Sequence, residues 1–112
     1  MSGAIDLAEL DPARFIHLVL DGLPDDPRDA SVEDMRVLSA ASEGLEVRVQ
    51  AVTDAWKAIA ARVLDGGAEH VEFGEAALLN LLTRRCVLAR DELHSYTRSA
   101  LRARGFHITT NE

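Results

Sequence analysis

The sequence predicts an all-α, bundle-like protein: an antiparallel hairpin of two long amphipathic helices, preceded by one shorter helix. Three observations predict this fold class. All three prolines lie within the first 27 residues of the 112-residue chain, which leaves long stretches without a strong helix breaker. Those stretches are rich in Ala, Leu, Arg and Glu, which favour helices, and their apolar residues recur at the spacing of a helix that buries one face. We expect a single domain over residues 1–112, with 1–10 and 106–112 as looser tails.

The shorter helix is expected over residues 12–21. Asp11 followed by Pro12 is a typical start signal, because the carboxylate can accept hydrogen bonds from the first-turn N–H groups and proline fits that turn. Gly22 ends the helix, and residues 23–30 form a loop. The apolar residues in between lie nearly all round the helix, so we expect it to be buried on more than one side.

The first long helix is expected over residues 32–65, with Ser31 as its N-cap. Its apolar residues form one stripe and also fit a heptad repeat. They are Met35, Leu38, Ala41, Leu45, Val49, Val52, Trp56, Ile59, Ala60 and Val63. Gly44 is the weak point, because glycine costs about 1 kcal/mol relative to alanine inside a helix and could split the segment. The stripe keeps its phase across Gly44, so we favour one continuous helix, about 50 Å long at about 1.5 Å per residue.

The second long helix is expected over residues 75–104, where neither glycine nor proline occurs. Its apolar stripe consists of Leu78, Leu79, Leu82, Cys86, Ala89, Leu93, Tyr96 and Ala100. Asp91 could begin a separate helix instead, but no nearby breaker supports that alternative. Gly105 is suited to end the helix in a left-handed conformation, with Phe106 folding back onto Leu101.

This hairpin leaves its apolar seam only partly covered. Residues 66–74 make the turn between the long helices, with room for a short extended piece at residues 70–73. Each long helix shields one flank of the other, and the short helix cannot cover a seam of about 45 Å. We therefore expect a second copy of the chain to complete a four-helix bundle around a two-fold axis.

Composition sets limits on the class of protein. The chain has a net charge of -7 and a single cysteine, Cys86, so it can form no internal disulfide. The place of Cys86 in the apolar stripe predicts a buried thiol. The first residues lack the basic region and apolar run of a signal peptide, and no stretch approaches the roughly 20 apolar residues that span a membrane. We expect a cytoplasmic protein that makes no membrane contact.

The residues that carry chemistry form no recognisable site. The histidines lack the spacing of a zinc site; they are His17, His70, His94 and His107. There is no nucleophile elbow, no phosphate-binding loop and no calcium loop. We expect His17 to be a packed residue with one hydrogen bond. The sequence thus predicts no catalytic residue, no metal ligand and no cofactor-binding residue.

Charge is divided unevenly along the chain. Residues 1–82 carry sixteen acidic and six basic side chains, a balance of -10. Residues 83–112 carry six arginines and three acidic residues, a balance of +3. We take arginines of this basic helix, together with an apolar residue on an otherwise polar helix face, as the candidate interaction surface. It consists of Arg84, Arg90, Arg98, Arg102, Arg104 and Val47.

Three functions fit these observations. We favour a small, non-enzymatic, homodimeric protein–protein interaction module, such as an adaptor, inhibitor, regulatory or assembly factor, because packing uses nearly every patterned residue. The first alternative is a nucleic-acid-binding regulator, although Asp91 lies among the arginines and would repel a phosphate. The second is a small helical enzyme with an inter-helix pocket that uses Ser42, His94 and arginines outside the stripes. The basic helix could also face acidic helices, within the chain or across a dimer, and so set their orientation.

Overall fold

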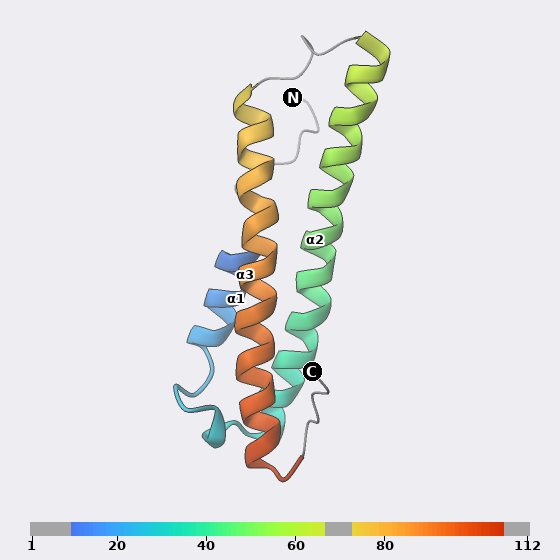
Figure 1. Cartoon of the computed structure of the whole chain (residues 1–112). Coiled ribbons are helices and arrows are strands. Elements are labelled where there is room, and N and C mark those ends of the chain that lie inside the picture. Colours follow the sequence, from blue (N-terminus) through green and yellow to red (C-terminus); the bar gives the residue numbers. More distant parts are fainter. Residues whose placement is uncertain (1–9, 67–72, 107–112) are drawn as a thin grey trace, which may run out of the picture.

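The computed structural model describes residues 10–66 and 73–106, which form a long helical hairpin with a shorter helix packed on it (Figure 1). In chain order the elements are α1 (Pro12–Asp21), the 3₁₀ helix η2 (Pro27–Asp29), α2 (Val32–Gly66) and α3 (Phe73–Ala103). The described residues contain no strand, and the predicted all-α fold is confirmed. Of the expected extended piece, Phe73 belongs to α3 and the remainder lies outside the described residues, as do 1–9 and 107–112 of the expected tails.

α1 begins and ends where the sequence predicts. Oδ1 of Asp11 accepts hydrogen bonds from the backbone N–H groups of Ala13 (3.0 Å) and Arg14 (3.3 Å). Pro12 occupies the first helical position and Gly22 the C-cap. A helix leaves the backbone N–H groups of its first turn without partners inside the helix, and Asp11 supplies a partner for two of them. The caps, rather than the apolar residues, therefore fix the length of α1.

α2 is a single helix of 35 residues. A capping box closes its start, because Oγ of Ser31 accepts from the N–H of Asp34 (3.1 Å) while Oδ2 of Asp34 accepts from the N–H of Ser31 (2.8 Å). The helix continues through Gly44 without a break. The prediction of one continuous helix is confirmed.

The packing of α1 explains the glycine in the middle of α2. A Cβ atom on Gly44 would come within 2.7 Å of Cζ in the ring of Phe15. The guanidinium of Arg48 lies 3.8 Å from the centroid of the same ring, and its Nη1 donates a hydrogen bond to the carbonyl of Gly44 (3.1 Å). Gly44 therefore lets α1 approach α2 closely, and this contact offsets the low helix propensity of glycine.

α3 runs through Asp91 without a break and ends in a Schellman motif. Gly105 has a left-handed φ of 92°. Its N–H donates to the carbonyl of Arg102, and the N–H of Phe106 donates to the carbonyl of Leu101, both at 3.0 Å. The predicted C-cap is confirmed, although the side chain of Phe106 remains largely exposed.

The apolar core has two parts. Where α1 packs on the hairpin, the first part contains Ile16, Leu23, Leu38, Ala41, Leu45, Ala89 and Leu93. Towards the end where α2 stops and α3 starts, the second part comes from those two helices alone and contains Val52, Ile59, Leu79, Leu82 and Cys86. We call these regions the three-helix half and the two-helix half. Figure 1 shows that α1 lies beside the hairpin only in the former.

The apolar stripe of α2 is not buried along its whole length. Trp56, Ala60 and Val63 belong to the predicted seam, yet Ala60 is exposed and the exposed fractions of Trp56 and Val63 are 36% and 41%. All three lie in the two-helix half. This partial exposure agrees with the expectation that each long helix shields only one flank of the other and leaves the apolar seam partly uncovered in a single chain.

Two expectations about α1 are wrong. His17 and Leu18 are exposed, whereas we expected a packed histidine and burial on more than one side. α1 buries Pro12, Ala13 and Ile16 against the hairpin. Because α1 lies on the outside of the hairpin, its other side faces away from both long helices.

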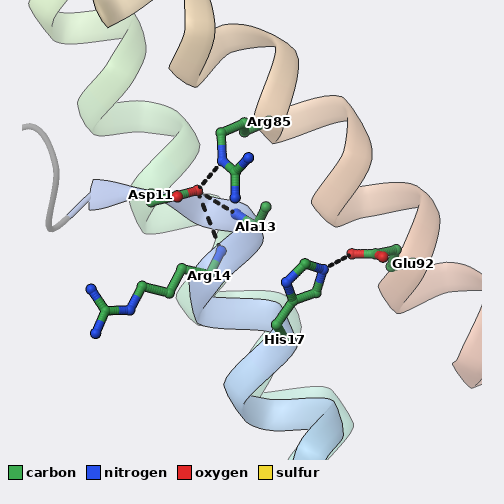
Figure 2. A network of polar contacts seen from close by, with 6 residues as sticks. All are labelled: Asp11, Ala13, Arg14, His17, Arg85 and Glu92. Atoms are coloured by element: carbon green, nitrogen blue, oxygen red, sulfur yellow. Dashed lines mark hydrogen bonds and ion pairs between the residues drawn. The ribbon is translucent and has the colours of Figure 1, made fainter.

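Polar contacts attach α1 to α3 (Figure 2). Nε of Arg85 donates to Oδ1 of Asp11 (2.7 Å), and Nε2 of His17 lies 2.8 Å from Oε1 of Glu92. Oε1 of Glu92 is buried and has no hydrogen-bond partner of good geometry. The contact between His17 and Glu92 is therefore an ion pair that forms when the imidazole is protonated. Further down α3, the hydroxyl of Tyr96 donates to a carbonyl of the loop after α1 (2.6 Å). These contacts hold α1 and its loop in register with α3.

The environment of Asp11 predicts a pH-dependent contribution to stability. Partial burial would raise its pKa, but the hydrogen bonds from Arg85 and from the first-turn N–H groups outweigh it, so the pKa of Asp11 lies below its usual value. A carboxyl group with a lowered pKa stabilises the fold above its unfolded pKa of 3.8, and this contribution disappears as the pH falls through the folded value.

We therefore expect Asp11→Ala to lower the free energy of unfolding at pH 7 by about 0.5–2 kcal/mol, mainly through the lost N-cap. Urea unfolding from pH 7 down to pH 2 measures this, and the difference from the original protein should shrink below pH 4. Asp11→Asn is the control, since asparagine caps a helix well but cannot ionise; it should lose less at pH 7, and the part that it loses should also disappear below pH 4. A loss for Asp11→Ala that stays constant down to pH 2 would contradict the expectation.

Candidate interaction surface

The hairpin has one face covered by α1 and an opposite face, which we call the open face. On the covered face, Arg48 of α2 and Arg85 of α3 reach residues of α1. By helical spacing the open face carries Ser42, Trp56, Ala60 and Leu64 of α2 and Thr83 and His94 of α3. Side chains of α2 and α3 meet there without α1, as in the contacts of Trp56 with Thr83 and of Glu46 with Arg90.

A hydrogen bond between the two long helices positions Trp56 on the open face. The indole Nε1 donates to Oγ1 of Thr83 (2.9 Å), and Oγ1 of Thr83 in turn donates to the carbonyl of Leu79 (2.9 Å). The polar atom of the indole is thereby satisfied within the chain, while part of the ring stays exposed. An exposed tryptophan that is already ordered loses little side-chain entropy when a partner covers it.

Another apolar side chain lies exposed in the same region, since Leu64 near the end of α2 is 86% exposed. Together with Trp56, Ala60 and Val63, it gives the two-helix half an apolar surface. Single exposed apolar residues are ordinary, but several on one face are typical of association sites and make this face the candidate.

The three-helix half of the open face contains a hollow between α2 and α3. Its volume is about 310 Å³, and it is lined by Met35, Leu38, Ser39, Ser42, Leu93, His94 and Thr97. The hollow brings together Ser42 and His94, which the sequence suggests as parts of an enzyme pocket. Both side chains are exposed, and no hydrogen bond joins them to each other or to another described residue. No catalytic pair is formed there.

The structure divides the five predicted arginines into two groups. Arg84, Arg98 and Arg102 are exposed along the outer side of α3, with Asp91 between the first two. Arg90 instead forms an ion pair with Glu46 of α2 at 3.1 Å. Arg104 donates a hydrogen bond to the carbonyl of Ala30 (3.1 Å). Two of the five arginines are thus used within the chain. Val47, which is 68% exposed, lies on the outer side of α2 and belongs to neither face of the hairpin.

The roles of several residues on this surface cannot be predicted from the sequence. Arg85 and Thr83 lie off the apolar stripe and carry no local signal of their roles, because their partners Asp11 and Trp56 are far away in the chain. The sequence does show that Leu64 is an apolar residue outside the predicted stripe of α2. Its exposure depends on which face of the hairpin α1 covers, which is a tertiary property.

Cys86 is buried as predicted, with an exposed fraction of 6%. Burial, which disfavours the thiolate, raises the pKa of Cys86 above its usual value. Among the described residues, no three His, Cys, Asp or Glu side chains are grouped in a way that could hold a metal ion. In the same part of the chain, no helix combines the length and the apolar character needed to cross a membrane. Comparisons with protein-family models, with curated proteins and with solved structures found no match for this chain.

Proposed function

We propose that the protein is a small, non-enzymatic, cytoplasmic interaction module, acting as an adaptor, inhibitor, regulatory or assembly factor. Its open face receives helices of another polypeptide, which complete a bundle. The observation that carries this proposal is that the apolar stripe of one continuous hairpin is covered to different extents along its length. The apolar stripe of α2 supplies buried residues to the core in both halves, yet it leaves Trp56 and Val63 partly exposed in the two-helix half.

The physical argument concerns how two helices bury apolar surface. Two helices cover only one flank of each other, so the two-helix half keeps apolar area in contact with water. Covering that area gains roughly 25 cal/mol per Å² of apolar surface removed from water. The hairpin is held by ion pairs such as Arg62 with Glu75 (2.6 Å), so the surface is formed before a partner arrives. A partner with an amphipathic helix suits such a surface.

The two alternative functions have weaker support. Binding of nucleic acid needs a continuous set of phosphate-contacting cations, whereas Arg90 and Arg104 are engaged within the chain and Asp91 lies between Arg84 and Arg98. Enzymatic function needs an oriented acid, base or nucleophile, and the hollow beside His94 offers none with a described hydrogen-bonded partner. Neither has an observation that favours it over protein binding.

Site-specific photo-crosslinking in the cells that produce the protein tests this proposal. A photoreactive amino acid placed at Leu64, on the open face, should give one discrete crosslinked product. The same amino acid at Val47 is the matched control, because both positions are exposed apolar residues of α2. The product from position 64 should disappear when Trp56→Asp is added, because a buried charge opposes docking. Equal labelling from both positions, or no product from position 64, would refute an interaction through the open face.

A further inference from the structure

We propose that the ion pair between His17 and Glu92 is a pH-sensitive clamp, which holds α1 against α3 near pH 6 and loses its hold near pH 8. A clamp here means a contact that sets how often α1 separates from the hairpin. Both residues lie on the covered face. The inference therefore goes beyond the proposed function and does not depend on a partner at the open face.

The contact joins α1 to α3 in the three-helix half (Figure 2). Nε2 of His17 lies 2.8 Å from Oε1 of Glu92, and this oxygen is buried without a hydrogen-bond partner of good geometry. A buried carboxylate oxygen has lost its water, and that loss is unfavourable unless a cation or a donor faces the oxygen. The protonated imidazole is such a cation, whereas the neutral imidazole carries no charge and has a lone pair on one of its nitrogens. The strength of the contact therefore changes with the charge of His17.

The neighbouring arginines leave Glu92 to His17. Arg85, two turns before Glu92 on α3, donates to Oδ1 of Asp11 at 2.7 Å, and this hydrogen bond raises the pKa of Arg85 above its usual value. Arg14 of α1 is exposed, and Figure 2 shows its guanidinium pointing away from the pair. The charges of Asp11, Arg85 and Glu92 thus alternate in sign along the boundary between α1 and α3. Protonation of His17 adds a fourth charge that continues this alternation and attracts its neighbour.

Acidic groups accompany the contact on both of its helices. Asp21 follows His17 one turn later on α1, and Asp91 precedes Glu92 on α3. Burial places one oxygen of Glu92 in a medium of lower dielectric constant, where its charge acts more strongly than in water. These charges attract the protonated imidazole and have no comparable effect on the neutral one. Uptake of a proton by His17 is therefore coupled to the docking of α1.

The charged groups of the other packed elements are engaged elsewhere. Arg48 of α2 lies 3.8 Å from the centroid of the Phe15 ring, and helical spacing puts Phe15 on the opposite side of α1 from His17. Arg28 of η2 forms an ion pair with Asp26 at 2.7 Å. Neither arginine competes with His17 for Glu92, so the imidazole decides the charge at this point of the boundary.

The length of α1 makes this contact matter. α1 has 10 residues, and a helix this short is marginal by itself, so it depends on its contacts with the hairpin. Ile16, the residue before His17, is fully buried in the core of the three-helix half with Leu45 and Leu93. When the imidazole is neutral, α1 keeps this apolar contact but loses one of the polar contacts that attach it to α3. Opening of α1 then becomes more frequent, while the two-helix half stays closed.

A double-mutant cycle on the full chain tests the inference. The original protein, His17→Gln, Glu92→Gln and the double variant are unfolded in urea near pH 6 and near pH 8, which bracket the usual titration of histidine. At the lower pH the coupling between the two positions should change the folding equilibrium constant about threefold, as expected for a partly exposed ion pair. At the higher pH the coupling should vanish, because the neutral imidazole is not attracted to the carboxylate. His94→Gln, at an exposed histidine of the open face, is the matched control and should leave the pH dependence of stability unchanged.

Hydrogen exchange shows whether the effect is confined to α1. After correction for the intrinsic exchange rates, the amides of α1 should open about two to three times more often near pH 8 than near pH 6. The amides of α2 and α3 in the two-helix half should show no such difference, and in Glu92→Gln the difference in α1 should disappear. Equal coupling at both pH values, or none at the lower pH, overturns the clamp, as does a pH effect spread evenly over all three helices. Circular dichroism verifies that each variant is helical.

Discussion

Replacing Gly44 by leucine should lower the free energy of unfolding by about 1–3 kcal/mol, the usual cost of forcing extra methylene groups into a packed contact. Leucine is the better helix former, so helix propensity alone predicts a gain of nearly 1 kcal/mol. The ring of Phe15 opposes that gain, because even a Cβ atom on residue 44 would lie 2.7 Å from it. Phe15 cannot easily turn aside, since Arg48 lies over its ring. α1 must therefore shift away from α2.

Urea unfolding followed by circular dichroism measures this change. Ala58→Leu is the matched control: it introduces the same side chain at an exposed position of α2, and it should leave the stability within about 0.5 kcal/mol of the original. Adding Phe15→Ala to Gly44→Leu should recover part of the loss, because the two side chains then fill one space. If Gly44→Leu is as stable as the Ala58→Leu control, the close approach of α1 to α2 does not contribute to the free energy of unfolding.

Replacing Leu45 by alanine should lower the free energy of unfolding by about 2–5 kcal/mol, which is the range for leucine in a well-packed core. Leu45 is 1% exposed and belongs to the part of the core where all three helices meet. A side chain enclosed on three sides leaves a cavity that neighbouring helices cannot readily collapse. The loss would be a large fraction of the 5–15 kcal/mol that stabilises an ordinary domain.

Thermal and urea unfolding at low protein concentration, where association is weak, would measure it. Leu64→Ala is the control, since Leu64 is 86% exposed and its truncation should change the stability by less than about 0.5 kcal/mol. Similar losses from both substitutions would mean that the division into a covered and an uncovered half is incorrect. The contrast between the two residues thus tests the fold and the exposed surface together.

The sequence predicts the helices of this protein well, because the signals that begin and end them are local. Asp11 accepts bonds from N–H groups two and three residues away, and Gly105 closes α3 through its immediate neighbours. Both kinds of cap depend on residue types at fixed short spacings, which a single sequence contains in full. The bounds of α1 are correct for this reason, and those of α2 and α3 deviate by at most two residues.

The surface is harder to predict, because it depends on contacts between distant residues. Asp11 and Arg85 are 74 positions apart, and their pairing sets where α1 lies along α3. Leu45, in the part of the core where all three helices meet, is buried, whereas Trp56, on the same stripe but on the open face, is partly exposed. Helical periodicity gives both residues the same inward direction. Nothing in that periodicity says which face of the hairpin the third helix covers, so the open face appears only in three dimensions.

The position of Trp56 gives the molecule a spectroscopic reporter of its own. The chain contains one tryptophan, so its fluorescence comes from a single place. That place is the open face, where the indole N–H is already bonded to Thr83 and the ring stays partly in water. Indole emission shifts to shorter wavelength when water leaves the ring. The emission wavelength of the natural protein, without label or substitution, therefore reports whether this face is exposed to water or covered by a partner.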